Sequence, residues 1–138
     1  MNQVTLTTID GLDPRDMLAI RSRLTKPDSE FQAEVTGVLA GESSSCTPVA
    51  VWHADGAMLA WACSHVWRGM QTLEQYVEER YRNTGKATSL TAFLLSCGVI
   101  SAGKPLAVFS PTTADIARKL GCADVVLFER RGADWAEV

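Results

Sequence analysis

The stretch that most constrains the fold spans residues 77–94, where a strand-like segment meets a glycine-containing turn and then an apolar-periodic helix. The turn, residues 82–87, reads Arg-Asn-Thr-Gly-Lys-Ala. Backbone N–H groups in the first turn of a helix lack intrahelical acceptors, and the helix dipole favours negative charge there. Gly85 lets the backbone approach a ligand closely, and Arg82 and Lys86 add positive charge. The stretch therefore predicts a phosphate site between a strand and a helix.

This loop resembles the acetyl-CoA pyrophosphate loop of the GNAT N-acetyltransferase superfamily. The family's loop reads Arg/Gln-x-x-Gly-x-Gly/Ala and follows a strand end of the form Val-x-x-x-x-Arg. Both halves of the pattern are present, and they share Arg82. The resemblance implies that acetyl-CoA is bound by Val77, Arg82, Asn83, Thr84, Gly85, Lys86, Ala87 and Thr88.

Simpler roles exist for the polar residues of this loop. Thr84 and Thr88 either bind phosphate or cap the helix, and Arg82 and Lys86 either bind phosphate or lie on solvated surface. The placement of the loop between a strand and a helix favours the phosphate site.

The composition is that of one globular domain. With 138 residues, of which 46% are hydrophobic and 21% charged, the chain can bury a core without metal or disulfide support, so we expect a single domain over residues 1–138. The net charge of −3 argues against a general nucleic-acid binder, which usually carries a basic patch. The sequence lacks signal-peptide and membrane-span patterns, which predicts a cytoplasmic protein. The cysteines are widely spaced and are expected to be free and mostly buried.

Hydrophobic periodicity and turn residues predict the other elements. Before the loop, the first elements are a strand over 3–9 and a helix from Asp13-Pro14 to about Thr25, followed by a break at Lys26-Pro27-Asp28. A second helix then runs from about residue 31 to Gly41, and a hairpin over 49–67 and a strand over 70–77 follow it. After it they are a helix up to Gly103, a buried strand over 105–109, a helix opened by Thr112-x-x-Asp115 and ended by Gly121, and a strand over 125–128. Strand, helix and strand over 72–109 indicate a right-handed parallel crossover. The fold class is therefore α/β (α+β), with a central mixed, mostly antiparallel sheet flanked by helices.

This order of elements is similar to that of GNAT chains, and Lys119-Leu120-Gly121 resembles the end of the helix that follows the family's fifth strand. The family often has a Tyr about four residues before that Gly, which protonates the departing CoA thiolate. This chain has Ala117 there, and Ser110 corresponds to the family's usual Asn after the fifth strand.

The C-terminus also departs from the family pattern. It leaves room for one clear strand after Gly121, where the family usually has a β-hairpin, and it places Trp135 near a frayed end. We therefore expect a sheet that is one strand short and an acceptor site that is incomplete or completed by a second subunit. An open strand edge would favour a homodimer.

Acetyl transfer to an amine needs a base for the ammonium proton, a polarised thioester carbonyl and an acid for the sulfur. In the family a backbone N–H near the end of the fourth strand polarises the carbonyl, and this position corresponds to Val77. Glu74 is the candidate base, directly or through a water, and its more common alternative is an exposed charge on a strand edge. Ser110 is the candidate donor to the thiol, with a strand-terminating or helix-capping role as the alternative.

Metal chemistry is not expected, because His53, His65 and Cys63 match no zinc signature. The resemblance implies an acetyl-CoA-dependent N-acetyltransferase in which an amine of unidentified nature attacks the thioester directly. Two alternatives stay open. One is a non-catalytic CoA-binding or interaction module that keeps the fold, and the other is a small binding module in which the loop is coincidental.

Overall fold

The computed structural model describes residues 3–23 and 30–138. The predicted break at Lys26-Pro27-Asp28 and the predicted helix end near Thr25 lie outside these residues. The elements are β1 (Gln3–Thr8), a 3-10 helix η1 (Ile9–Gly11), α1 (Pro14–Arg23), α2 (Glu30–Leu39), β2 (Pro48–Ala54), β3 (Ala57–Cys63), β4 (Val66–Trp67), β5 (Met70–Val77), a 3-10 helix η2 (Glu79–Tyr81), α3 (Lys86–Ser96), β6 (Leu106–Val108), α4 (Pro111–Lys119), β7 (Val125–Arg131) and β8 (Asp134–Glu137).

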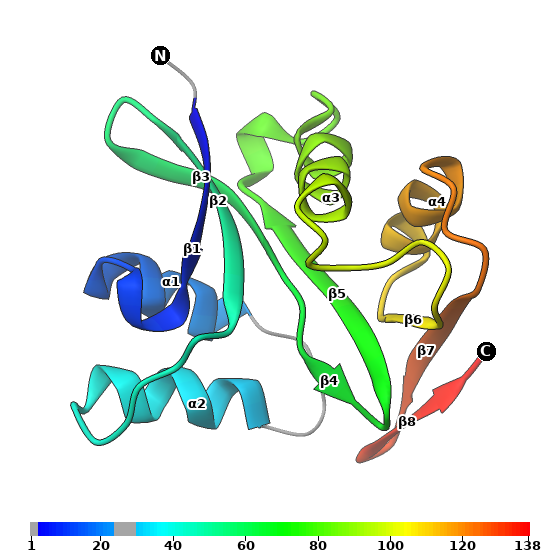
Figure 1. Cartoon of the computed structure of the whole chain (residues 1–138), viewed down its shortest axis with the longest axis horizontal. Coiled ribbons are helices and arrows are strands. Elements are labelled where there is room, and N and C mark those ends of the chain that lie inside the picture. Colours follow the sequence, from blue (N-terminus) through cyan, green and yellow to red (C-terminus); the bar gives the residue numbers. More distant parts are fainter. Residues whose placement is uncertain (1–2, 24–29) are drawn as a thin grey trace.

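The strands form one mixed sheet in the order β1-β2-β3-β5-β6-β7-β8, with β4 paired to β5. β5 and β7 run parallel to β6, and all other pairs are antiparallel. Figure 1 shows α1 and α2 on one face of the sheet and α3 and α4 on the other. The predicted mixed, mostly antiparallel sheet with a parallel strand-helix-strand unit is confirmed.

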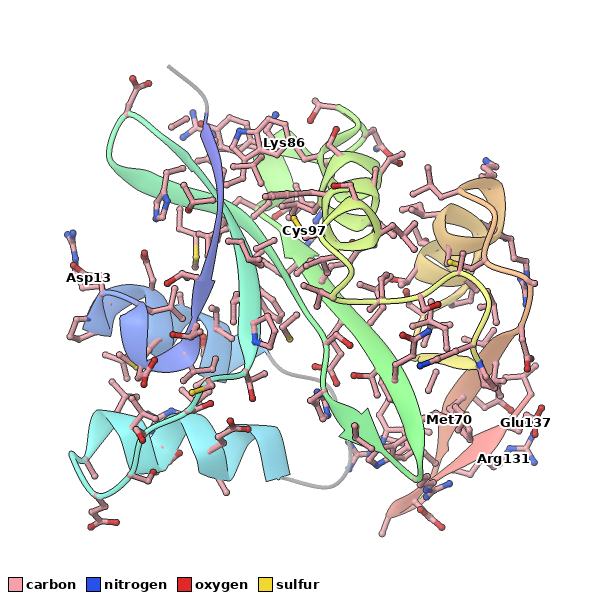
Figure 2. The ribbon with its side chains drawn as sticks, viewed as in Figure 1. Asp13, Met70, Lys86, Cys97, Arg131 and Glu137 are labelled. Atoms are coloured by element: carbon pink, nitrogen blue, oxygen red, sulfur yellow. The ribbon has the colours of Figure 1, made fainter. Side chains whose placement is uncertain are left out.

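Alternating side chains of the strands bury two cores, one on each face. On the α1 and α2 face, Val51 and Trp61 pack with Ile20 and Val35. On the α3 and α4 face, Leu73 belongs to the core that contains Leu90, Leu94, Leu106 and Val108. Figure 2 shows these layers of side chains between the sheet and the helices. Adjacent residues of β5 thus belong to opposite faces.

The start of α1 is as predicted, because Asp13 Oδ1 accepts a hydrogen bond of 2.8 Å from the Arg15 backbone N–H. α3 is shorter than predicted and ends at Ser96 instead of near Gly103. Gly98 has a φ of 74°, and the next residue's backbone N–H, that of Val99, donates to Leu94 O at 3.0 Å. This glycine closes the helix early.

The start of α4 also differs from the prediction. Ser110, rather than Thr112, is its N-cap: the Ser110 side-chain oxygen accepts from the Thr113 backbone N–H at 3.2 Å. Pro111 follows the cap as the first helical residue, a position where its missing N–H costs nothing. The end of α4 agrees with the prediction, since Gly121 follows the helix with a φ of 96°.

The expectation that the sheet lacks a C-terminal strand is wrong. β7 and β8 form an antiparallel hairpin in which Arg131 pairs with Asp134 across a turn at Gly132-Ala133. Trp135 is only 7% exposed and is not frayed. It belongs to the C-terminal aromatic cluster, formed by Trp67, Phe109, Phe128 and Trp135. A missing strand was the reason for expecting a homodimer, and that reason no longer holds.

We expect Phe128→Ala to lower the free energy of unfolding by about 3–5 kcal/mol, because it removes a ring from this buried cluster. The Phe128 ring centroid lies 4.9 Å from that of Trp67 in an edge-to-face arrangement. Urea denaturation measures the change. Val66→Thr is the control, because Val66 is 69% exposed and its replacement should change stability by about 0.5 kcal/mol or less. Equal effects of the two variants would contradict a packed C-terminal hairpin.

All four cysteines are free, as predicted, but only Cys63 and Cys122 are buried, whereas Cys46 and Cys97 are exposed. Within the described chain, every helix is too short or too polar to span a lipid bilayer.

Candidate functional site

The site forms where β5 and β6 part. The two strands pair only from Gln71 to Leu73 on β5. Beyond Leu73, β5 continues to Val77 in register with β3 alone, while the chain leaves β6 at Val108 and turns into α4. The β6 side of β5 is therefore open over its last residues.

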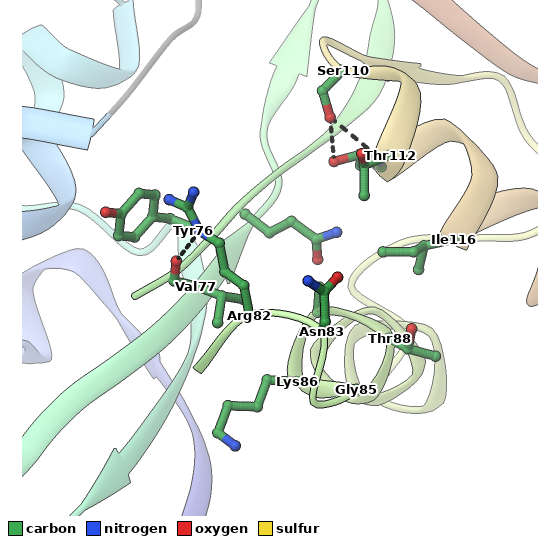
Figure 3. A pocket seen from close by; sticks show the side chains of 13 residues that line it. Tyr76, Val77, Arg82, Asn83, Gly85, Lys86, Thr88, Ser110, Thr112 and Ile116 are labelled. Carbon is green, nitrogen blue, oxygen red and sulfur yellow. Dashed lines mark hydrogen bonds between the residues drawn. The ribbon is translucent and has the colours of Figure 1, made fainter. Parts of the chain in front are cut away.

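A pocket of about 520 Å³ occupies this opening. Its walls come from the end of β5, the loop and first turn of α3, and the first turns of α4 (Figure 3). The predicted cofactor residues that line it are Val77, Arg82, Asn83, Gly85, Lys86, Ala87 and Thr88. Thr84 is not in the lining, because its hydroxyl is turned back to donate to the Tyr81 carbonyl. The structure thus brings together the predicted loop, apart from one residue.

The loop holds an unusual backbone conformation that exposes the start of α3. Asn83 and Gly85 have φ values of 63° and 82°, in the left-handed region that glycine and asparagine tolerate. Gly85 is the N-cap, with no side-chain cap, and its carbonyl accepts from the Ser89 N–H at 3.0 Å. The N–H groups of Lys86, Ala87 and Thr88 precede that first intrahelical bond, which leaves them available for an anion.

The two cationic side chains hold the loop in place. Arg82 Nε donates to the Val77 carbonyl at 3.0 Å, and its guanidinium lies 5.4 Å from the Tyr76 ring centroid. The Lys86 ammonium lies 5.0 Å from the Trp52 ring centroid and 5.5 Å from that of Tyr81. Figure 3 shows Arg82 beside Tyr76 and Lys86 extending away from Ser110. Both charges raise the local positive potential, and both also fix the loop by cation–π contacts.

The open edge of β5 carries the backbone groups of Gln75 and Val77. Glu78 N donates to Leu59 O at 2.8 Å, and backbone groups in an antiparallel pair alternate in direction. The backbone N–H and carbonyl of Tyr76 therefore point toward β3, whereas those of Gln75 and Val77 point toward the opening. The Val77 carbonyl on this edge takes the Arg82 hydrogen bond, and the Val77 N–H lies on the same edge.

A second pocket, of about 310 Å³, adjoins the first. The two share Gln75, Tyr76, Ser110 and Thr113 as a common wall. The rest of the second pocket is mostly aromatic, with one acidic residue, and includes Trp61, Glu74, Phe109 and Trp135. We call it the aromatic pocket.

Glu74 does not have the exposed position that a strand-edge charge would have. Glu74 is 5% exposed, and it pairs with Cys63 on β3, next to the point where the pairing of β5 with β6 ends at Leu73. The alternation of side chains along β5 places Glu74 on the same face as Tyr76, opposite to Gln75. A buried acidic side chain thus lines a pocket that meets the loop pocket at the open edge of β5.

Neither a protein-family model nor a curated protein matches the sequence. Solved structures do match the fold. The structure of AAC(6')-Iy in complex with the bisubstrate analog CoA-S-monomethyl-acetylneamine aligns over 90% of this chain and 92% of its own, with 17% identity and a TM-score of 0.54. The chain has the GNAT acetyltransferase fold. A ribosomal-protein-alanine N-acetyltransferase from Brucella melitensis biovar Abortus 2308 aligns over 87% of this chain and 88% of its own, with 16% identity and a TM-score of 0.48.

Within this GNAT fold, the position that corresponds to the family's proton-donating Tyr has no polar side chain. Ala117 on α4 is fully buried. About two turns earlier, at the N-cap of α4, the Ser110 hydroxyl lies 2.9 Å from the Thr113 Oγ1, at the junction of the two pockets. Sequence reasoning singled out Ser110 but missed Thr113, although the spacing from an N-cap to the third helical residue is the signal that joins them.

No cluster of three or more metal-binding side chains occurs among the described residues. His53 Nε2 instead lies 2.9 Å from Asp16 Oδ2, in a hydrogen bond between β2 and α1.

Proposed function

We propose that this chain is an acetyl-CoA-dependent N-acetyltransferase that transfers the acetyl group to a small amine by direct attack. The observation that carries the proposal is the pair of adjoining pockets at the open edge of β5. One contains a glycine loop at a helix N-terminus, and the other contains the buried Glu74. The AAC(6')-Iy structure supports it, because a similarly folded chain holds a CoA-based bisubstrate analog.

In this proposal the loop binds the pyrophosphate of acetyl-CoA. The N–H groups at the start of α3 donate to its oxygens, and Asn83 and Thr88 lie beside them in the pocket lining. Arg82 and Lys86 contribute positive potential from the sides of the loop. The thioester reaches the junction of the pockets, where Val77 N–H donates to the carbonyl oxygen.

The chemical step takes place at this junction. Glu74 accepts a proton from the substrate ammonium, directly or through a water, which frees the nitrogen lone pair. The nitrogen attacks the thioester carbon, and the carbon–nitrogen bond forms. The carbon–sulfur bond then breaks, the second amine proton leaves to solvent or base, and CoA departs as a thiolate that receives a proton. The products are the N-acetylated amine and CoA.

The Ser110–Thr113 hydroxyl pair is our candidate for the group that meets the departing sulfur. Two hydroxyls that share one hydrogen bond retain a second proton for a ligand. Ser110 Oγ already accepts from the Thr113 backbone N–H, so the pair is oriented by the helix cap. A hydrogen bond from this pair would stabilise the thiolate until solvent protonates it.

The direct test of the proposed function combines isothermal titration with acetyl-CoA and an assay for free CoA thiol in the presence of a panel of primary amines. We expect saturable binding and amine-dependent thiol release. Binding without release for any amine would favour the non-catalytic CoA-binding module, and absence of binding would leave the fold with a coincidental loop.

Ser110 separates its two roles in one comparison. Ser110→Ala should lower the free energy of unfolding by about 0.5–2 kcal/mol through loss of the cap and lower kcat by roughly tenfold through loss of a hydrogen bond of about 1.4 kcal/mol. Ser110→Asn keeps a capping oxygen, so it should restore stability but not kcat. Recovery of both by asparagine would show that the hydroxyl serves only the cap.

A further inference from the structure

Two glutamines on β5, Gln71 and Gln75, lie on the same face of the sheet because they are four residues apart. The protein uses both ends of the Gln71 amide: Nε2 donates to the Ser101 carbonyl at 2.7 Å, and Oε1 accepts from the Ser101 backbone N–H at 2.8 Å. The Gln75 amide is held at one end, where Oε1 accepts from the Thr91 hydroxyl at 2.9 Å. Among the described residues, its Nε2 has no hydrogen-bond acceptor.

The difference between the two glutamines follows from their places on β5. Gln71 pairs with Leu106 of β6, so the neighbouring chain supplies its partners. Gln75 lies beyond Leu73, where β5 and β6 have parted, and its side chain lines both the loop pocket and the aromatic pocket. The free end of the Gln75 amide thus belongs to the opening between the strands.

The free amide nitrogen is accessible to a ligand. Gln75 is half-buried, and its Nε2 is not one of the buried side-chain atoms that lack a partner in the described chain, which include the indole nitrogens of Trp61 and Trp135. A side-chain amide nitrogen carries two protons and donates only. Gln75 therefore presents a hydrogen-bond donor at the junction of the two pockets.

The other end of the amide is anchored in the core. Thr91 on α3 is fully buried, and its hydroxyl lies 2.9 Å from both Gln75 Oε1 and the Ala87 carbonyl oxygen, which share its one proton. This anchor fixes the plane of the amide before a ligand binds. A donor that is already oriented needs no reorganisation during a reaction.

We infer that Gln75 is a further catalytic residue, whose Nε2 donates a hydrogen bond to the carbonyl oxygen of the thioester. This inference rests on the proposed acetyl transfer and adds a second donor to the Val77 N–H. The thioester has to lie at the junction of the pockets to meet both CoA and the amine, and Gln75 belongs to the wall that the two pockets share.

Two donors suit the charge that develops in the reaction. As the amine nitrogen bonds to the carbonyl carbon, the π electron pair of the carbonyl moves onto its oxygen. Hydrogen bonds from the Val77 N–H and Gln75 Nε2 stabilise this negative charge. The pair then returns to restore the carbonyl, the carbon–sulfur bond breaks, and CoA leaves as a thiolate. Gln75 lowers the barrier without exchanging a proton.

The first experiment compares the dissociation constants of acetyl-CoA and S-ethyl-CoA, which carries a methylene group in place of the carbonyl. Gln75→Met keeps the length of the side chain and removes both polar atoms, whereas Gln75→Glu keeps the acceptor for Thr91 and removes the donor. In both variants the ratio of the two constants should shift by about threefold to tenfold in favour of S-ethyl-CoA. A change that only deforms the pocket would weaken both ligands equally.

Gln71→Met is the matched control. It removes the hydrogen bonds with Ser101 from the same face of the same strand, so it should lower stability in urea denaturation and leave the ratio of the dissociation constants unchanged. Circular dichroism checks that each variant is folded.

The second experiment observes the carbonyl directly. A hydrogen bond to a carbonyl oxygen lowers its stretching frequency, so acetyl-CoA labelled with ¹³C at the carbonyl should absorb at a lower frequency on the original chain than on Gln75→Met. For an amine that releases CoA thiol with the original chain, Gln75→Met should lower kcat by roughly a hundredfold, a larger change than the one in acetyl-CoA affinity.

The outcomes separate this inference from the proposed function. An unchanged ratio and an unchanged stretching frequency in Gln75→Met would overturn the inference and leave the acetyltransferase intact. Retention of the original ratio by Gln75→Glu would show that the amide does not donate to the carbonyl, and equal weakening of both ligands would make Gln75 a structural residue; either result overturns the inference. Failure of the original chain to bind acetyl-CoA would instead overturn the proposed function.

Discussion

Gly85→Asp is expected to abolish acetyl-CoA binding and to leave the fold intact. Gly85 has a φ of 82°, and a Cβ built there meets no heavy atom within 4 Å, so the substitution costs roughly 1 kcal/mol of backbone strain without a clash. The new carboxylate lies at the N-terminus of α3, where it accepts from the same N–H groups as the phosphate and repels its charge. Affinity should fall by roughly a hundredfold or more, which corresponds to about 3 kcal/mol.

Gly132→Asp is the matched control for this variant. Gly132 has a φ of 64° and also offers open space to a Cβ, but it lies in the β7–β8 turn. In urea denaturation Gly132→Asp should lose about 1 kcal/mol, and Gly85→Asp should lose no more than that because its carboxylate caps α3. Only Gly85→Asp should lose binding in isothermal titration. Unchanged affinity in Gly85→Asp would exclude this loop as the phosphate site.

The loop could be predicted because its conformation depends on local residues. Gly85 and Asn83 adopt positive φ values, and these residue types are the ones that do so in a turn. The apolar periodicity after Lys86 marks the helix, and the turn at Arg68-Gly69 marks the start of the strand that ends at Val77. The structure confirms a strand, a turn and a helix in this order, because each signal lies within a few residues of the element it describes.

Features that depend on distant parts of the chain could not be predicted. β8 is a short edge strand, and its partner β7 ends in charged residues, which resemble a polar tail in the sequence. The contact of Trp135 with Phe109 and its pairing with Arg130 show that this segment is packed, and both partners are distant from, or outside, the strand itself. The burial of Glu74 likewise results from strands β3 and β6 on either side of β5, and neighbours so far away leave no local pattern.

The side-chain hydrogen bonds of the site were also only partly predictable. Ser110 was a candidate because it corresponds to the Asn that the family usually has after its fifth strand, and the structure shows it capping α4 through Thr113. Lys86 and Arg82 were expected to point at phosphate, and the structure shows both in contact with aromatic rings. Composition predicts the sign of the local charge, whereas the direction of a long side chain depends on rings supplied by β2, β5 and η2.

Glu74→Gln is expected to remove turnover and preserve acetyl-CoA binding. Glutamine has nearly the same shape but cannot accept the ammonium proton, and loss of a general base typically lowers kcat/KM by about 10²–10⁴-fold. Glu74 does not line the loop pocket, so the dissociation constant of acetyl-CoA should change by about threefold or less.

The test measures kcat/KM over a range of pH together with acetyl-CoA affinity. Glu79→Gln is the control, since Glu79 is an exposed carboxylate in η2, beside the loop. This control variant should keep kcat/KM within about twofold, because a solvated charge contributes little to a buried reaction. A base that must be ionised gives a rate that falls at low pH, and this acidic limb should disappear in Glu74→Gln. If Glu74→Gln retained both the rate and the limb, the base would have to be sought elsewhere in the aromatic pocket. If acetyl-CoA affinity fell together with the rate, Glu74 would act on the cosubstrate rather than on the amine. Retained affinity with lost turnover is the result that assigns the two adjoining pockets to the two substrates.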